Sequence, residues 1–309
     1  MSLTGLFVPL ITPFTANDEL DCTALQKLAG EVLDDGASGL VALGTTAEPA
    51  NLTVAERATV VEICADACAA RGSELIVGVG SNSTADSVAQ LARLDAHATA
   101  ALTVVPYYTR PSEDGVVEHF RRLAAASPVP LVIYNVPHRT ARPLSADTLL
   151  RLAELPNVAG FKHAAGGIDD TTIAFLSALP DHTSVLAGDD LFAGPLVALG
   201  GTGAILASAN VAAGAYAELL KAWHTGPRKH ARQLHNRLAA LSAALFAEPN
   251  PVVIKAVLAA RGVISSPHVR LPLLPAGRAT TAAALSRLPG RQAYSAATEF
   301  GRLPTLGWA

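Results

Sequence analysis

One of the five lysines in this 309-residue chain, Lys162, follows directly after an apolar segment. The stretch GFKHAAGG spans residues 160–167, and the apolar run at 158–161 predicts a buried β-strand. Lysine is almost never fully buried without a partner. Either the ammonium forms a buried ion pair, with Asp189 or Glu48, or the amine is a nucleophile that forms a Schiff base. Apolar surroundings suit the second interpretation, because they disfavour the charged form of a group whose ordinary pKa is about 10.4.

The other four lysines have less unusual surroundings. Lys27, Lys221 and Lys229 lie in polar or amphipathic helix patterns, which predict solvated amines. Lys255 follows the Asn-Pro pair of NPVVIKAV on a predicted C-terminal helix. Lys162 is therefore the one lysine predicted at a strand end.

Schiff-base chemistry also needs groups that move protons and hold the substrate. Tyr134 ends the preceding predicted strand, and its phenol is suited to shuttle protons; the alternative is a core aromatic with a satisfied hydroxyl. Thr45 and Thr46 follow Gly44 in a tight turn and offer hydroxyls and backbone N–H groups to a carboxylate; the alternative is an ordinary polar turn. Arg139 could bind a carboxylate through two hydrogen bonds, or could be an exposed loop arginine.

Short apolar runs alternate with helical patterns over the chain up to about residue 210. One helix start carries a capping box, Thr53 with Glu56 three residues later. Strands that are apolar on both faces and separated by helices indicate a parallel sheet, and eight such units predict an α/β fold, a closed (β/α)₈ TIM barrel. The predicted strands are 6–10, 39–43, 75–79, 101–105, 131–134, 158–161, 184–187 and 203–206.

Such a barrel places reactive groups at the C-terminal ends of its strands. Polar and aromatic residues gather where the second to eighth predicted strands end, in GTTAEP, GVGSNST, VVPYYTRP, YNVPHRT, FKHAAGG, AGDD and GAILAS. We therefore expect them to form a single site at one end of the barrel.

The C-terminal part of the chain reads as helical with no strands between the helices. We predict a catalytic barrel at residues 1–225 and a C-terminal helical region at 226–309. The sequence after about Pro289 is polar and poorly periodic, and it allows no assignment.

Composition excludes several classes of function. The net charge of −3 and the lack of long basic runs argue against nucleic acid and against anionic membranes. The uncharged stretch 191–217 is long enough to span a bilayer, but its glycines and Pro195 favour a short helix, a turn, a buried strand and a second helix. Three cysteines form no disulfide framework, and the N-terminus does not resemble a signal peptide, which predicts a cytoplasmic protein.

The motifs GTTAEP, PYYTRP, YNVPHRT, FKHAAGG, AGDD and LFAEPNPVVIKAVL resemble those of the dihydrodipicolinate synthase and N-acetylneuraminate lyase superfamily of pyruvate-dependent class I aldolases. The resemblance extends from about residue 4 to about residue 287. It implies a (β/α)₈ barrel with a C-terminal helical region, assembled as a homotetramer of two tight dimers.

By this resemblance, four residues are catalytic. Lys162 matches the lysine that forms the imine with pyruvate, and Tyr134 matches the tyrosine that shuttles protons. Thr45 matches the hydroxyl that relays protons between Tyr134 and a second tyrosine, which corresponds to Tyr108 and is supplied across the tight-dimer interface.

Four further residues bind substrate by resemblance. Thr46 matches the residue that binds the pyruvate carboxylate, and Arg139 matches the arginine that binds the carboxylate of aspartate semialdehyde. Gly188 and Ile205 match positions whose backbone lines the pocket. The implied partners are pyruvate and a small aldehyde, and the implied chemistry needs no metal and no organic cofactor.

Three positions depart from the superfamily pattern. Ala47 replaces a glycine, which would strain the turn if that residue needs a positive φ. Pro49 stiffens the same turn, and His163 stands where an acidic residue is usual. We expect the His163 imidazole to point to the barrel wall and stay neutral, with tuning of Lys162 as the alternative.

Three functions remain open from the sequence. The leading one is the condensation of pyruvate with L-aspartate semialdehyde to 4-hydroxy-tetrahydrodipicolinate, a step of lysine and diaminopimelate biosynthesis. A sister activity would act on another 2-keto acid, such as 4-hydroxy-2-oxoglutarate or a keto-deoxy sugar acid. A non-catalytic barrel that binds a ligand is the third possibility.

Overall fold

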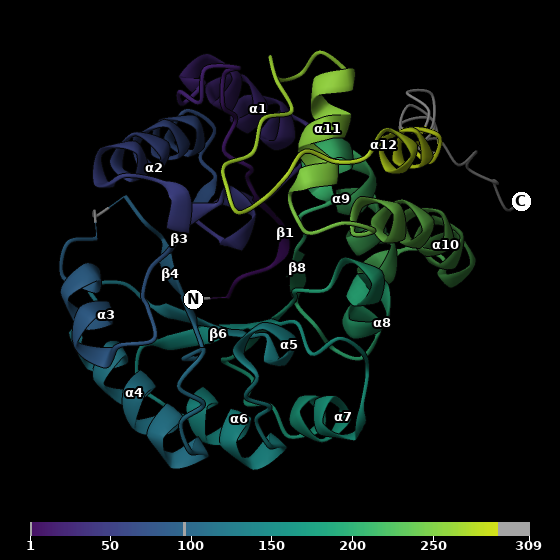
Figure 1. Ribbon diagram of the computed structural model, residues 1–309. Coiled ribbons are helices and arrows are strands. Elements are labelled where there is room, and N and C mark those ends of the chain that lie inside the picture. The colour runs from purple at the N-terminus through teal and green to yellow at the C-terminus, as the bar shows by residue number, and fades with distance from the viewer. Residues whose placement is uncertain (1, 95–96, 290–309) are drawn as a thin grey trace, which may run out of the picture.

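The computed structural model describes residues 2–94 and 97–289, and its centre is a closed barrel of eight parallel strands (Figure 1). The strands follow one another around the barrel in chain order, and β8 pairs with β1. This confirms the predicted TIM-barrel fold. The strands are β1 (Gly5–Pro9), β2 (Gly39–Ala42), β3 (Glu74–Gly78), β4 (Ala100–Val104), β5 (Leu131–Asn135), β6 (Val158–His163), β7 (Ser184–Ala187) and β8 (Gly203–Ile205).

Helices surround the strands, as Figure 1 shows. Most begin with a side-chain cap, and the predicted capping box of Thr53 and Glu56 is present at the start of α2. The one-turn helix α5 was not predicted, because four residues carry no measurable periodicity. The surrounding helices are α1 (Cys22–Asp34), α2 (Val54–Ala69), α3 (Thr84–Leu91), α4 (Glu113–Ala126), α5 (Pro137–Thr140), α6 (Ala146–Ala153), α7 (Asp170–Ser177), α8 (Ala193–Ala198) and α9 (Ala209–Thr225).

The uncharged stretch 191–217 forms α8, β8 and the first part of α9, as predicted. Helix α9 packs against β1 and α1 and so completes the ring. No helix in the described part of the chain is long and apolar enough to cross a membrane.

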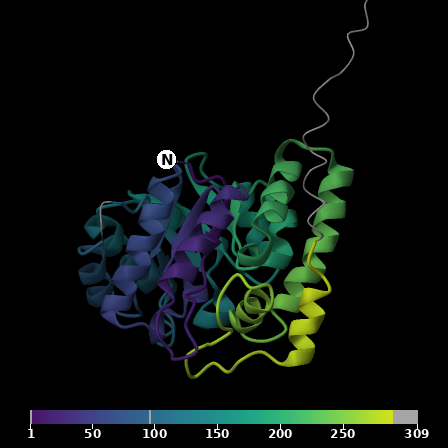
Figure 2. The ribbon, with the colours of Figure 1, turned by 90° about the horizontal axis from the view of Figure 1, so that it is seen from above.

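Three more helices follow the barrel: α10 (Arg228–Leu245), α11 (Val252–Ala260) and α12 (Arg278–Leu285). Figure 2 shows α10 and α12 along one side of the molecule. Helix α10 packs on α8 and α9, α11 packs on α9, and α12 contacts α10 and α11. The division into 1–225 and 226–309 stays a prediction, and residues 290–309, which the sequence left unassigned, lie outside the described residues.

Candidate active site

Lys162 and Tyr134 lie side by side inside the barrel. They are register partners on β6 and β5, and the Lys162 Nζ lies 4.3 Å from the centroid of the Tyr134 ring. Both are buried, with 5% and 8% of their surface exposed. The alternation of a strand points both side chains inward at the same level. The structure therefore places these two predicted residues next to each other.

The proposed ion pair between Lys162 and Asp189 or Glu48 is wrong. The Asp189 Oδ2 accepts the backbone N–H of Gly166 at 2.7 Å, and Glu48 pairs with Lys255 at 2.8 Å. Within residues 2–94 and 97–289, no carboxylate forms a salt bridge with Lys162. The Lys162 amine therefore has an aromatic ring beside it and, among the described residues, no carboxylate within salt-bridge distance.

Gly188 and Ile205 adjoin the Lys162–Tyr134 pair. The Gly188 N–H donates to the carbonyl of His163 at 2.7 Å, which brings the two backbones close. A Cβ at position 188 would lie 2.9 Å from the Cγ of Lys162, so the position accepts only glycine without a shift. Ile205 is fully buried and belongs to the inner apolar cluster that also contains Tyr134. The structure therefore brings these four predicted residues together.

Asp190 is a buried acid near this group that the sequence did not single out. Its Oδ1 accepts the N–H of Ser208 at 2.6 Å, and its Oδ2 has no hydrogen-bond partner in the described part of the chain. Burial raises the pKa of Asp190 to about 6, against the opposing effect of the Lys162 charge. The only sequence signal was its place as the second aspartate of AGDD, after the seventh strand.

Thr45 and Thr46 lie in a short 3₁₀ turn, Thr45–Ala47, directly after β2. Thr46 is buried, and its Oγ1 accepts a hydrogen bond from the Asn250 Nδ2 at 2.9 Å. Thr45 is exposed. No hydrogen bond joins Thr45 to Tyr134 among the described residues.

The strain suspected at Ala47 is not present. The residue of this turn with a left-handed backbone is Glu48, with φ of 52°, while Ala47 lies in the 3₁₀ turn and is buried. Its carbonyl accepts the Thr12 hydroxyl at 2.8 Å. Pro49 opens the next 3₁₀ turn, Pro49–Asn51, a position where its fixed φ fits. Both departures are therefore compatible with the turn.

Tyr108 and Arg139 lie apart from the buried group. Tyr108 is 87% exposed, and its backbone has a φ of 70°, a conformation that is uncommon for a residue other than glycine. Arg139 is exposed on α5. Neither forms a hydrogen bond or an ion pair with Lys162 or Tyr134 among the described residues.

His163 faces the barrel wall, as predicted. Its Nε2 lies 3.1 Å from the Thr172 hydroxyl, which itself donates to Asp169 at 2.7 Å. The hydroxyl hydrogen is thus used, so Nε2–H is the donor and Nδ1 accepts from the Asn135 amide at 3.3 Å. The ring also packs on Phe175 of α7. Burial lowers the pKa of His163, which favours the neutral imidazole.

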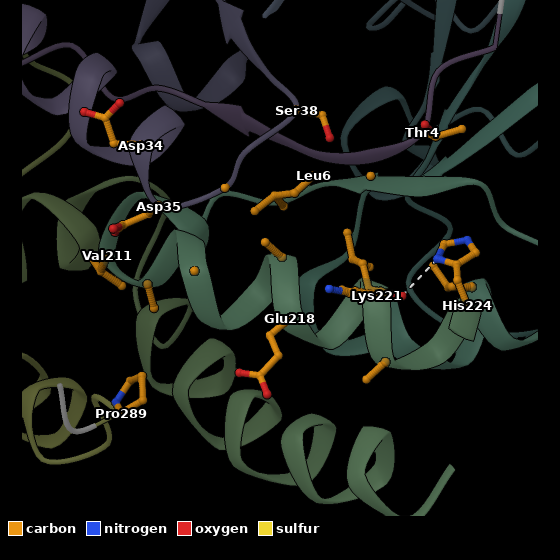
Figure 3. Close-up of a pocket in the computed structure, with 18 of the residues that line it drawn as sticks. Thr4, Leu6, Asp34, Asp35, Ser38, Val211, Glu218, Lys221, His224 and Pro289 are labelled. Carbon is orange, nitrogen blue, oxygen red and sulfur yellow. Dashed lines mark hydrogen bonds between the residues drawn. The ribbon is translucent and has the colours of Figure 1, made fainter. Parts of the chain in front are cut away.

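A groove of about 1910 Å³ opens at the other end of the barrel (Figure 3). It is lined by the start of β1, by Asp34 and Asp35 at the end of α1, and by Lys221 on α9. None of the predicted site residues lines it. The groove is therefore separate from the strand ends that carry Lys162.

A parallel barrel with a buried lysine beside a tyrosine at its strand ends has the arrangement of a Schiff-base aldolase. Residues 2–287 match the model of the Dihydrodipicolinate synthetase family. The chain belongs to this family of pyruvate-dependent lyases.

Relatives agree with this assignment over nearly the whole chain. The 4-hydroxy-tetrahydrodipicolinate synthase of Neisseria meningitidis serogroup B is 39% identical over 287 residues, covering 92% of this chain and 98% of the relative. The synthase of Salinibacter ruber is 42% identical, covering 89% and 91%. The crystal structure of the dihydrodipicolinate synthase from Acinetobacter baumannii complexed with pyruvate has a TM-score of 0.88 and 34% identity, covering 93% and 98%.

Proposed function

We propose that the protein forms a Schiff base between Lys162 and pyruvate and condenses it with L-aspartate semialdehyde to 4-hydroxy-tetrahydrodipicolinate. The observation that carries this proposal is the buried Lys162 amine, packed 4.3 Å from the Tyr134 ring centroid and without a carboxylate partner among the described residues. Relatives of 39% and 42% identity that are named as this synthase support the choice of reaction.

The proposed reaction starts from the neutral Lys162 amine. The amine attacks C2 of pyruvate, and loss of water gives the imine. C3 then loses a proton to form an enamine, whose C3 attacks the aldehyde carbon while the aldehyde oxygen takes up a proton. The amine of the second substrate finally attacks C2, closes the ring and expels the Lys162 amine.

The surrounding residues have roles that fit their chemistry. The Tyr134 phenol moves protons to and from the carbinolamine oxygen and C3, since it is next to the amine. The Thr46 hydroxyl and the backbone N–H groups of its turn bind the pyruvate carboxylate. Arg139, at the exposed rim, binds the carboxylate of the second substrate, for which a planar guanidinium is well suited.

Tyr108 is the basis for a proposed assembly. An aromatic residue that is 87% exposed on a backbone with φ of 70° gains little from its position in a single chain. We propose that two copies pack so that Tyr108 of each enters the other's site and relays protons through Thr45, and that two such dimers form a tetramer. Mixing Lys162→Arg and Tyr108→Phe chains after unfolding should regenerate sites that carry both native residues, and the restored activity should exceed that of either variant alone.

Reduction of the imine tests the central step. The intact protein is incubated with pyruvate and sodium borohydride and its mass is measured. We expect a reduced pyruvyl adduct on the wild-type protein and on the exposed-lysine control Lys221→Arg, and none on Lys162→Arg. No adduct on the wild-type protein would overturn the proposal and favour a barrel that only binds a ligand.

The second substrate needs its own assay. With the imine established, the enzyme is offered aspartate semialdehyde and, separately, 4-hydroxy-2-oxoglutarate and a keto-deoxy sugar acid. We expect turnover of pyruvate with aspartate semialdehyde to exceed cleavage of the other acids by at least tenfold in kcat/KM. A reversed preference would assign the protein to a sister activity of the same family.

A further inference from the structure

Two side-chain bridges join the turn after β2 to the segment that begins α11, more than two hundred residues away. The Asn250 amide donates to the Thr46 hydroxyl at 2.9 Å, and the Lys255 ammonium donates to the Glu48 carboxylate at 2.8 Å. We propose that Asn250 is a positioning residue: it directs the Thr46 hydroxyl hydrogen toward the pyruvate carboxylate, and the Glu48–Lys255 pair fixes the distance between the two segments. This inference rests on the proposed function, because it assigns the carboxylate to Thr46.

The direction of the Asn250 hydrogen bond decides what Thr46 can do. A threonine hydroxyl has one hydrogen to donate and two lone pairs that accept. Because the Asn250 amide donates, it occupies a lone pair and leaves the hydroxyl hydrogen free. No acceptor takes that hydrogen within the described residues. A carboxylate is an acceptor only, so it completes the pattern that Asn250 imposes.

The Glu48–Lys255 pair is buried far more completely than a surface ion pair. The two side chains are 1% and 0% exposed, and the Lys255 Nζ also lies 4.1 Å from the centroid of the Phe14 ring. The second Glu48 oxygen accepts the backbone N–H of Arg270 at 3.0 Å. A buried pair contributes little net stability after the loss of hydration. Its value here is geometric, since it holds the backbone two residues from Thr46.

A cluster of charged residues next to the pair adds further links between distant segments. The Arg270 guanidinium also contacts the Phe14 ring, with its Cζ 4.2 Å from the ring centroid. It donates hydrogen bonds to the carboxylates of Asp18 and Glu56. These bonds tie the segment around 270 to the start of α2 and to the loop before α1. The C-terminal region therefore supports the carboxylate site and is more than a cover on the barrel.

Trapping of the imine at varied pyruvate concentrations tests the role of Asn250. The half-saturating concentration reports pyruvate binding, and the adduct at saturation reports imine formation. We expect Asn250→Ala to raise the half-saturating concentration about tenfold, the equivalent of one hydrogen bond. Asn250→Asp should raise it further, because its carboxylate accepts the Thr46 hydrogen and repels the substrate. The adduct at saturation should be unchanged in both.

A double-mutant cycle separates positioning from a general structural effect. If Asn250 acts through the Thr46 hydroxyl, then Thr46→Val and Thr46→Val/Asn250→Ala should have equal half-saturating concentrations. The control Asn236→Ala alters an exposed asparagine of α10 and should behave as wild type. If Asn250→Ala does not fold, the uncharged Asn250→Leu, which is similar in size, takes its place in the cycle.

The outcomes distinguish this inference from the proposed function. Two outcomes would overturn the positioning role and leave the Schiff base intact, provided that the wild-type protein forms the adduct. Either Asn250→Ala leaves the half-saturating concentration of pyruvate unchanged, or the effects of Thr46→Val and Asn250→Ala are additive in the double variant. Absence of a wild-type adduct would overturn both. The double variant Glu48→Gln/Lys255→Met removes both buried charges together, and it should raise the half-saturating concentration several-fold while the adduct still forms. An unchanged value would overturn the role of the ion pair.

Discussion

Two buried lysines in this molecule differ in what surrounds their amines. Lys162 and Lys255 are 5% and 0% exposed, and each lies just over 4 Å from an aromatic ring centroid, at 4.3 and 4.1 Å. The difference is the counter-ion. Lys255 bonds to Glu48 at 2.8 Å, whereas Lys162 has no carboxylate partner among the described side chains. The salt bridge occupies the Lys255 amine, whereas no salt bridge among the described residues occupies the Lys162 amine.

The largest effect expected from this comparison concerns stability. Lys255→Met should lower the free energy of unfolding by about 3–5 kcal/mol, because it leaves the Glu48 carboxylate buried without its partner. Lys162→Met breaks no salt bridge among the described residues and removes only the attraction between the Lys162 charge and Asp190, so it should change that free energy by less than about 1 kcal/mol. Urea denaturation at pH 7 measures both, with the exposed Lys221→Met as the control. Equal losses for the two buried positions would contradict the comparison.

The same two variants, Lys162→Met and Lys255→Met, should have opposite effects on imine formation. Lys162→Met should abolish the borohydride adduct, and the folded fraction of Lys255→Met should still form it. Restoring neutrality with Glu48→Gln/Lys255→Met should recover most of the lost unfolding free energy, since both buried charges are then absent. A double variant as unstable as the single one would show that packing of the Lys255 stem outweighs its charge.

The next largest effect concerns the Tyr134 hydroxyl. Tyr134→Phe keeps the ring beside the Lys162 amine and removes only the phenol oxygen. Loss of a proton-transfer group typically slows a reaction by 10²–10⁴-fold, and we expect about 10²-fold here. Exchange of the pyruvate methyl hydrogens with deuterium, followed by NMR, isolates the C3 step. Exchange at the wild-type rate would remove Tyr134 from proton transfer and leave it as a packing residue.

A smaller effect is expected from crowding Lys162. In Gly188→Ala the new methyl would lie 2.9 Å from both the Lys162 Cγ and the Ala164 Cβ. The lysine stem must then move, and imine formation should slow by about tenfold, with a loss of about 1–3 kcal/mol in stability. Gly167→Ala is the matched control, since no atom lies within 4 Å of its added Cβ. Similar rates for the two variants would mean that the position of the stem does not limit the reaction.

Local sequence patterns predicted the part of the site that lies on the strands, which contains Lys162 and Tyr134. Alternation of apolar strands and helices indicated the barrel, and the register of two adjacent strands then placed Tyr134 beside Lys162. The bridges from Asn250 and Lys255 to the turn after β2 had no such signal. They join segments separated by about two hundred residues of chain, and only tertiary packing brings them together.

Backbone conformation in the turns was also beyond the sequence. The left-handed residues that follow β2 are Leu43 and Glu48, although the substitution of a family glycine had directed attention to Ala47. Which residue of a short turn takes positive φ depends on hydrogen bonds around it, such as that from Thr12 to the Ala47 carbonyl.

The smallest expected effect is a pH dependence of stability that comes from a residue next to Lys162. Lys255 is held by an anion, whereas the residue that follows Lys162 on β6, His163, is a buried imidazole whose pKa is lowered by burial. The unfolded chain binds a proton on this histidine near pH 6.5, and the folded chain binds it only at lower pH. Stability contributed by the neutral ring is therefore complete above about pH 6.5 and is lost as the pH falls through the folded pKa.

We expect the free energy of unfolding of the wild-type protein to fall by about 1 kcal/mol or more between pH 7 and pH 5.5. His163→Gln keeps an acceptor for Asn135 and a donor for Thr172 but does not titrate, so its unfolding free energy should depend less on pH over this range. A residual slope should remain, because burial also lowers the pKa of His119, to about 4, and that of His235. The raised pKa of Asp190, about 6, acts in the opposite direction and offsets part of this slope in every variant. His119→Gln is thus the matched comparison. The contradicting outcome is a pH dependence of the unfolding free energy that is unchanged in His163→Gln and reduced in His119→Gln. It would mean that the His163 imidazole does not change its protonation on unfolding.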